Sequence, residues 1–211
     1  RKKGAHEIIL KKFRDQKIDI LIGTQMIAKG LDVPNVTVVG VINADTAFYV
    51  PDFRASERTF QIITQVAGRT GRGPQGGRVV VQTYNPHHHA VTTSAAYDFP
   101  GFLAQELQMR KELDYPPFSR LIRILLQGTN EKQTRQAGER LSNKLRPALQ
   151  ESGDVLGPAA APLFRMKGRF RFHILVKTKS LSTVRPHILR LVQAISKPMQ
   201  VVVDVDPVSM M

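Results

Sequence analysis

Three absences narrow the class of this protein. The 211 residues include no cysteine, so the chain forms neither disulfides nor a cysteine-ligated metal site. They contain no apolar run of about eighteen residues that would span a bilayer, and the start does not resemble a secretory signal peptide. No Gly-x-x-x-x-Gly-Lys-Ser/Thr loop occurs, so the usual phosphate cradle with its lysine and magnesium ligand is missing. We therefore expect no membrane partner and no ATP hydrolysis by this chain alone.

Acidic side chains are also scarce. The sequence has 17 Asp and Glu against 31 Lys and Arg, which gives a formal net charge of +14. A field of this sign attracts polyanions, so it favours a nucleic-acid partner. By itself the charge is equally compatible with ribosomal or membrane-surface binding, and the motifs have to decide.

The most informative stretch is Gln65–Arg72, which places Arg69 and Arg72 three residues apart after an amphipathic helical run. Phosphoryl transfer spreads negative charge over the γ-phosphate oxygens, and guanidinium groups delivered from a second domain neutralise that charge. The two glycines of this stretch, Gly68 and Gly71, would let the backbone turn tightly behind the helix. The alternative is an ordinary helix end, with glycine at the cap and arginine at the negative end of the helix dipole.

A second polar segment, Gly23–Asp32, follows the apolar run Ile18–Ile22, which predicts a buried strand. Loops that follow strands are common ligand sites in α/β proteins. Gly23–Asp32 resembles motif V, and Gln65–Arg72 resembles motif VI, of the second motor lobe of superfamily 2 helicases. The two motifs occur in the order expected of that lobe. A purely structural interpretation stays open for two of these residues. Asp32 would then cap a turn, and Lys29 would be a solvated charge in a loop.

Further stretches resemble the PriA family of replication-restart helicases, also called primosomal protein N′, and together they cover essentially the whole chain. They are Thr24–Gly30, Asn43–Asp45, Pro51–Arg58, Gln82–Pro86, Tyr115–Phe118 and Asp204–Pro207. The chain opens in a charged helical segment that leads straight into a predicted motor strand. We therefore expect only the C-terminal part of such a helicase.

The resemblance implies roles for matching residues. Arg69 and Arg72 would be the catalytic arginines at the ATP γ-phosphate, with ATP and Mg²⁺ held in a site that a missing lobe completes. The implied nucleotide-binding residues are Gly30, Asp32, Gln65, Arg69 and Arg72. The residues implied near the junction with single-stranded DNA are Thr24, Gln25 and Lys29.

The family also carries paired zinc-binding cysteines before motif V. Because this chain has none, we attribute their absence to truncation, with loss of zinc as the open alternative, and predict no metal site here. The run His87–His89 is interpreted as a loop rather than a metal tract, because no carboxylate or further histidine lies at a ligand spacing nearby.

The predicted elements favour an α/β protein of two units. Residues 1–97 are expected to form a partial RecA-like helicase lobe, a parallel sheet with helices on both faces. Residues 98–118 would form a linker helix and a Pro-Pro turn, and residues 119–211 a small α+β C-terminal domain that resembles a split β-α-β ribosomal-protein fold. The predicted helices are Gly4–Gln16, Ala55–Ala67, Phe99–Leu113, Glu131–Leu149 and Ser182–Ile195. The predicted strands are Ile18–Gly23, Val36–Ile42, Arg78–Tyr84, Ser119–Gln127, Leu163–Lys167, Phe170–Thr178 and Met199–Val205, with Gly157–Pro162 as a loop.

One basic stretch, Arg165–His173, interleaves cations with aromatic rings and contains no acid. Cations would hold phosphates while rings stack on bases. Alternation along a strand, however, places Phe170 and Phe172 on one face and Arg169 and Arg171 on the other. We favour phenylalanines packed inward and both arginines outward, toward DNA or the acidic tail of a single-strand-binding protein.

These observations support three hypotheses. The first is the C-terminal part of an ATP-dependent 3′-5′ DNA helicase that restarts replication at stalled forks, with primosome proteins and the replicative helicase as partners, in the cytoplasm and at the nucleoid. The second is a non-catalytic module that binds forked or single-stranded DNA or single-strand-binding protein. The third, a different superfamily 2 translocase, is disfavoured by the Pro51–Arg58 and Asp204–Pro207 stretches.

Overall fold

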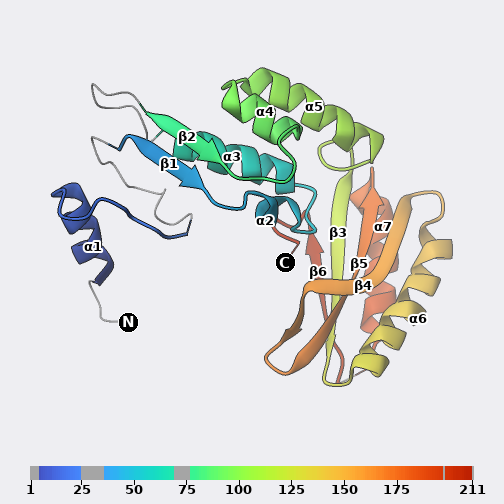
Figure 1. Ribbon diagram of the computed structural model, residues 1–211. Coiled ribbons are helices and arrows are strands. Elements are labelled where there is room, and N and C mark those ends of the chain that lie inside the picture. Colours follow the sequence, from blue (N-terminus) through green and yellow to red (C-terminus); the bar gives the residue numbers. More distant parts are fainter. Residues whose placement is uncertain (1–4, 25–35, 69–76, 197, 211) are drawn as a thin grey trace. The chain divides into compact units, whose positions relative to one another are not determined.

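The structure, a computed structural model, describes residues 5–24, 36–68, 77–196 and 198–210 (Figure 1). The chain divides into two compact units. The N-terminal unit comprises residues 1–49 and 54–103, and the C-terminal unit comprises residues 50–53 and 104–211. No helix among the described residues is long and apolar enough to cross a membrane.

The N-terminal unit contains a two-stranded parallel sheet. Its strands, β1 (Val38–Val41) and β2 (Arg78–Val81), pair in register from Val38 opposite Arg78 to Val41 opposite Val81. A parallel pair needs a crossover connection, and helices α2 (Asp45–Phe48) and α3 (Ala55–Ala67) lie within it. The remaining helices are α1 (Ala5–Arg14), α4 (His89–Ala95) and the first residues of α5 (Phe99–Glu112).

Aromatic rings build the small core of this unit. Phe60 of α3 stacks on Phe102 of α5 with ring centroids 4.3 Å apart, and His89 stacks on the same Phe102 at 5.5 Å. Ala90 and the partly buried Phe48 complete the cluster. The core therefore ties α2, α3, α4 and the start of α5 together.

The predicted strand Ile18–Gly23 is wrong. Residues 18–23 form no strand, and Ile20 and Ile22 are 74% and 81% exposed. An apolar run becomes a strand only where a neighbouring strand takes up its backbone hydrogen bonds, and among the described residues β1 and β2 pair only with each other.

Helices α2 and α4 were not predicted, because both are short and carry polar residues. The loop expected at His87–His89 is wrong at its last residue, where α4 begins. His88 caps this helix, since its Nδ1 accepts a hydrogen bond from the Ala90 amide at 3.2 Å.

The C-terminal unit contains a four-stranded antiparallel sheet. Its elements are β3 (Arg120–Gly128), α6 (Glu131–Leu149), β4 (Gly153–Met166), β5 (Arg169–Thr178), α7 (Leu181–Gln193) and β6 (Gln200–Val205). The strands lie in the order β4-β5-β3-β6, and every pairing is antiparallel. Both helices pack on one face of the sheet (Figure 1), where they enclose the main core.

This main core follows the period of each element. Alternate residues Ile122, Ile124 and Leu126 of β3 are at most 1% exposed, and Leu141 and Leu145 of α6 pack against them. Asn130 caps the start of α6, because its side-chain oxygen accepts a hydrogen bond from the Gln133 amide at 3.0 Å.

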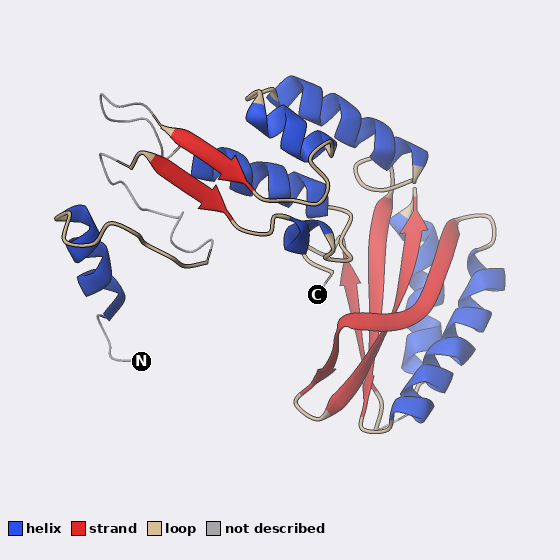
Figure 2. Cartoon of the chain, viewed as in Figure 1, coloured by secondary structure: helices blue, strands red, loops and turns tan. Residues whose placement is uncertain are grey.

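The predicted loop Gly157–Pro162 is wrong, because these residues lie inside β4, a strongly bent strand (Figure 2). The register of β4 against β5 shifts between Leu156 and Ala159 and again between Ala160 and Arg165. Prolines are tolerated at the edge of a sheet and at bulges, and β4 is an edge strand. Gly157 adopts φ +93°, and a Cβ there would lie 2.9 Å from the His173 carbonyl oxygen, so the bend requires glycine.

We expect Leu145→Ala to lower the free energy of unfolding by about 2–5 kcal/mol, because it removes a fully buried side chain from the main core. The matched control Leu156→Ala, at a position 37% exposed, should cost less than about 1 kcal/mol. Urea denaturation followed by far-ultraviolet circular dichroism measures both. Equal losses would contradict the assignment of the core.

Candidate functional site

Most of the predicted nucleotide and DNA residues lie outside the described residues. These are Gln25, Lys29, Gly30, Asp32, Arg69 and Arg72. Thr24 and Gln65 are described, and both are exposed. The described residues therefore do not bring a nucleotide site together, and the implied roles stay predictions.

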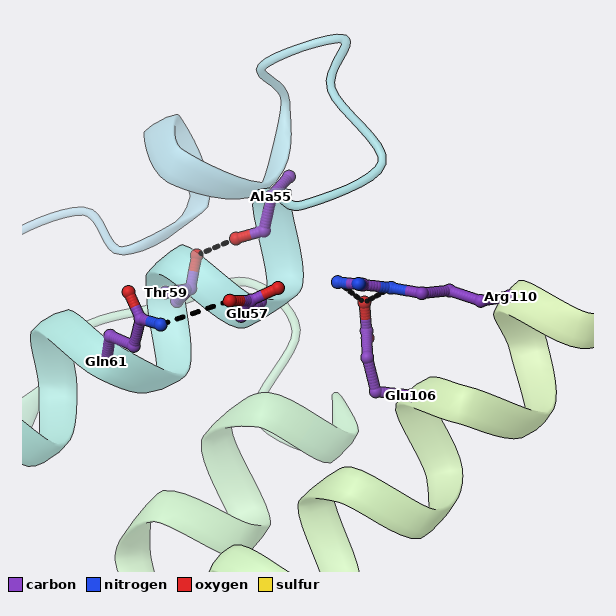
Figure 3. A network of polar contacts seen from close by, with 6 residues as sticks. All are labelled: Ala55, Glu57, Thr59, Gln61, Glu106 and Arg110. Atoms are coloured by element: carbon purple, nitrogen blue, oxygen red, sulfur yellow. Dashed lines mark hydrogen bonds and ion pairs between the residues drawn. The ribbon is translucent and has the colours of Figure 1, made fainter. Parts of the chain in front are cut away.

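Helix α3, which leads to Arg69, has the boundaries predicted for it. Phe60, Ile63 and Ala67 are buried, whereas Gln61 and Gln65, one turn apart, are exposed. Polar contacts run along its first turns (Figure 3): Thr59 Oγ1 donates to the Ala55 carbonyl at 2.9 Å, and Gln61 Nε2 donates to Glu57 Oε1 at 3.2 Å. Gln65 thus stands on the solvent side of a helix whose other side is fixed in the core.

The helix ends without the tight turn expected at Gly68. This residue has φ −66°, in the ordinary helical region, and its amide donates to the Thr64 carbonyl at 3.0 Å. A Cβ at Gly68 would meet only ordinary contacts, the nearest at 3.6 Å. The conformational argument for this glycine is therefore wrong, while Gly71 lies outside the described residues.

Two stretches singled out in the sequence contact each other in the N-terminal unit. Asp45, which is 4% exposed, accepts a hydrogen bond from Thr83 Oγ1 at its Oδ1 and from the Tyr84 amide at its Oδ2, each at 3.0 Å. A buried carboxylate with a side-chain and a backbone donor holds its position firmly. It fixes the chain after β1 to the chain after β2, at the ends of neighbouring parallel strands.

A second pair of stretches meets in the C-terminal unit. Phe53 stacks on Tyr115 with centroids 5.2 Å apart and ring planes 7° apart, and the Arg110 guanidinium lies over the Phe53 ring. Arg110 in turn pairs with Glu106 at 2.7 Å (Figure 3). The buried Asp52 accepts from the Met210 amide at 3.3 Å. Residues 50–53 are thereby incorporated in the C-terminal unit.

The Asp204–Pro207 stretch holds β6 to β3. Asp204 pairs with Arg123 at 3.2 Å, and Asp206 pairs with Arg120 and accepts from the Leu121 amide. These carboxylates act within the unit, between two strands that the sequence separates widely.

The sheet face opposite α6 and α7 carries a buried basic cluster of Arg123, Arg171 and His173, which are 9%, 5% and 9% exposed. Arg171 Nη1 donates to the Leu163 carbonyl of β4 at 3.2 Å. The Arg171 Nε and His173 Nδ1 atoms are buried and have no hydrogen-bond partner among the described residues. Such atoms carry a desolvation cost that an anion or a water would relieve.

The expected outward orientation of Arg171 is therefore wrong. Its long side chain lies under the bent second half of β4, a cover that the alternation of β5 alone does not reveal. Arg169 is half-buried. The exposed cations of this stretch are Lys167 and Arg165, whose guanidinium lies over the Phe170 ring. Phe172 is buried at 6%, as expected, and packs edge-on against Phe164 at 5.6 Å.

Burial lowers the pKa of His173 below its ordinary value of 6.5, and the neighbouring charges of Arg123 and Arg171 lower it further. Burial likewise lowers the pKa of Arg171, with Arg123 as the second cause. Like charges in a partly desolvated cluster disfavour each further proton. At neutral pH, His173 is therefore in its neutral form in the folded chain.

This shift predicts that stability falls on acidification. Since the folded-state pKa of His173 lies below 6.5, the unfolded chain binds the proton more readily. The free energy of unfolding should therefore decrease as the pH falls below about 6.5 and level off below the folded-state pKa. Urea denaturation at a series of pH values measures this trend against His173→Gln, which should lack the His173 contribution. Identical pH profiles for both proteins would rule out the effect.

Two family models match the chain in succession. Residues 1–74 match the helicase conserved C-terminal domain, and residues 111–208 match the primosomal protein N C-terminal domain. The first match defines the class: residues 1–74 belong to the C-terminal domain of helicases, which is a RecA-like lobe.

The curated relatives name the family more narrowly. The chain is 39% identical to a replication restart protein PriA from Synechocystis over 99% of its length, 38% identical to that of Bacillus subtilis over 100%, and 40% identical to that of Treponema pallidum over 99%. It spans 25%, 27% and 32% of these relatives' own lengths. The chain belongs to the PriA family and corresponds to its C-terminal part, as the sequence predicted.

Proposed function

We propose that this chain is the C-terminal part of an ATP-dependent 3′-5′ DNA helicase that recognises stalled forks and restarts replication by primosome assembly. The observation that carries the proposal is the succession of the helicase match and the primosomal match in one chain. Relatives named replication restart proteins align with nearly all of it.

In this function Arg69 and Arg72 are the catalytic arginines, and Gly30, Asp32 and Gln65 complete this chain's side of the nucleotide site. When bound, ATP with Mg²⁺ supplies the phosphoryl group, whose developing charge the arginines stabilise. Gln65 fits the role, because it is an exposed amide on the rigid helix that leads to both arginines. We assign zinc to no residue of this chain, which has no cysteine.

The catalytic role is tested in a chimera in which this chain replaces the matching C-terminal part of the Bacillus subtilis relative. We expect Arg69→Ala and Arg72→Ala each to lower the DNA-stimulated ATPase rate by about 10³-fold or more, as loss of an arginine finger does. Arg78→Ala, at an exposed arginine of β2, should leave the rate unchanged. The chain alone should not hydrolyse ATP.

A chimera that hydrolyses ATP normally with both arginines replaced would eliminate the motor assignment. The binding-module function would then remain, and one feature favours it: the C-terminal unit has a core of its own, in which twelve of the described residues form one buried cluster.

The finer fold assignment is part of the proposal. We assign residues 1–97 to a partial RecA-like lobe with helices on both faces of a parallel sheet, residues 98–118 to a linker, and residues 119–211 to a split β-α-β domain of the ribosomal-protein type. The element order β-α-β-β-α-β and the sheet order β4-β5-β3-β6 support the last of these.

The proposed partners are forked and single-stranded DNA, single-strand-binding protein, primosome proteins and the replicative helicase, in the cytoplasm and at the nucleoid. Thr24, Gln25 and Lys29 would contact DNA in the motor. In the C-terminal unit, Arg169 would meet phosphates or the acidic tail of single-strand-binding protein, and Arg171 would lie beneath it as a buried charge.

For the DNA contact, we expect Arg169→Glu to weaken binding of a forked oligonucleotide and to reduce the slope of log K against log salt by about one, the signature of one lost phosphate contact. The control Arg190→Glu makes the same charge change at an exposed site on α7 and should leave the slope closer to that of the unaltered chain. Fluorescence anisotropy at several salt concentrations measures both. Equal slopes for the two variants would show that only net charge matters.

A further inference from the structure

A groove lies between α6 and the end of α7 in the C-terminal unit, beside the residues that follow β3 and precede β6. It has a volume of about 500 Å³. A volume of this size accommodates several side chains. Ala137 and Leu141 of α6 form its floor with the partly buried Leu191, Ile195 and Met199, all of which pack on the main core.

The rim of the groove is basic and amide-rich. Arg140 and Lys144, one turn apart on α6, are exposed, and neither has an ion pair or hydrogen bond to a residue that the structure describes. Gln133 and Gln136 continue the same stripe toward the start of the helix. The lining includes no acidic residue, so the groove offers cations and amides to a ligand and no repulsion to carboxylates.

The lining also includes no aromatic residue. Single-stranded nucleic acids are usually held by rings on which bases stack, and this groove offers only aliphatic side chains below its cations. An apolar floor with a cationic rim instead matches an amphipathic helix, which presents aliphatic side chains at i, i+3 and i+4 and carboxylates beside them. From residue 133 to residue 144 the polar stripe extends about 16 Å, or three turns of helix.

We propose that the groove between α6 and α7 docks an acidic amphipathic helix of a partner protein. The partner's aliphatic side chains lie on Leu191, Ile195 and Met199, and its carboxylates pair with Arg140 and Lys144. The groove is lined by residues of the helical side of the sheet, whereas Arg169 lies on β5 and the buried basic cluster lies on the opposite face of β3 and β5. The proposal therefore does not rest on the motor function or on the DNA contact.

The test uses the full 211-residue chain. The probe is a fluorescein-labelled peptide of about 18 residues, or five turns, built from Glu and Leu in an amphipathic pattern, with an acetylated start and an amidated end. Fluorescence anisotropy at near-physiological salt measures its affinity. The double variant Arg140→Glu, Lys144→Glu should bind about tenfold more weakly or worse. Ala194→Trp, which fills the groove from an exposed position, should do the same without a charge change.

Matched controls separate the groove from net charge. Lys132→Glu with Arg185→Glu reverses two exposed cations outside the lining, and Gln193→Trp adds the same ring beside it. Both should keep most of the affinity, and circular dichroism verifies that every variant is folded. A peptide with Lys in place of Glu should bind far more weakly.

Three results would overturn the proposal. If Ala194→Trp binds the peptide normally, the peptide is held elsewhere. If the Lys peptide binds as well as the Glu peptide, the basic rim plays no part. If an unlabelled single-stranded oligonucleotide displaces the peptide and itself loses affinity in Ala194→Trp, the groove is a nucleic-acid site.

Discussion

The C-terminal unit depends on β3, a strand that is hydrogen-bonded along both edges and buried on both faces. It pairs with β5 on one side and β6 on the other. Ile122, Ile124 and Leu126 face the helices, while Leu121 and Leu125 are buried on the opposite face at 1% and 5% exposure. A strand in this position fixes the register of its neighbours, since a slip of one residue would exchange the two sets of side chains.

Because β3 is buried on both faces, its covered basic side chain needs a carboxylate partner from the neighbouring strand. Arg123 is the one basic residue of this strand that is nearly covered, and a buried cation needs a partner. Asp204 of β6 lies opposite Arg123 in the sheet and pairs with it, and Asp206 does the same for Arg120 at the strand's start. The two carboxylates of the Asp204–Pro207 stretch therefore have a structural role that the sequence did not indicate. Arg171 adds to this buried charge and His173 lies beside it, and burial together with the charges of Arg123 and Arg171 lowers the pKa of His173.

The sequence was most informative where local signals agree with tertiary packing. Helices α3 and α6 have their predicted ends, because each has a clear apolar stripe, and α6 also has an asparagine cap. Three of the failures share one cause, which is the presence or absence of a partner remote in sequence. The run Ile18–Gly23 has the composition of a strand, but it pairs with no strand in the part of the chain that the structure describes. Gly157–Pro162 has the composition of a loop but lies on a sheet edge that tolerates proline. Arg171 occupies the predicted face, but that face is covered by β4.

The candidate motor site shows the same dependence on remote partners. Motif residues such as Arg69 were found from spacing and resemblance, whereas the contacts of Asp45 with Thr83 and Tyr84 required the fold. In the two-stranded sheet that those contacts brace, Val38 and Val80 are 59% and 51% exposed, and Ile42, directly after β1, is 75% exposed. A parallel sheet is normally covered on both faces, and two strands alone are marginally stable. The C-terminal unit, by contrast, encloses its core with its own helices. Among the described residues, the two units thus differ in how their sheets are covered: that of the N-terminal unit leaves apolar side chains exposed, whereas that of the C-terminal unit packs against α6 and α7.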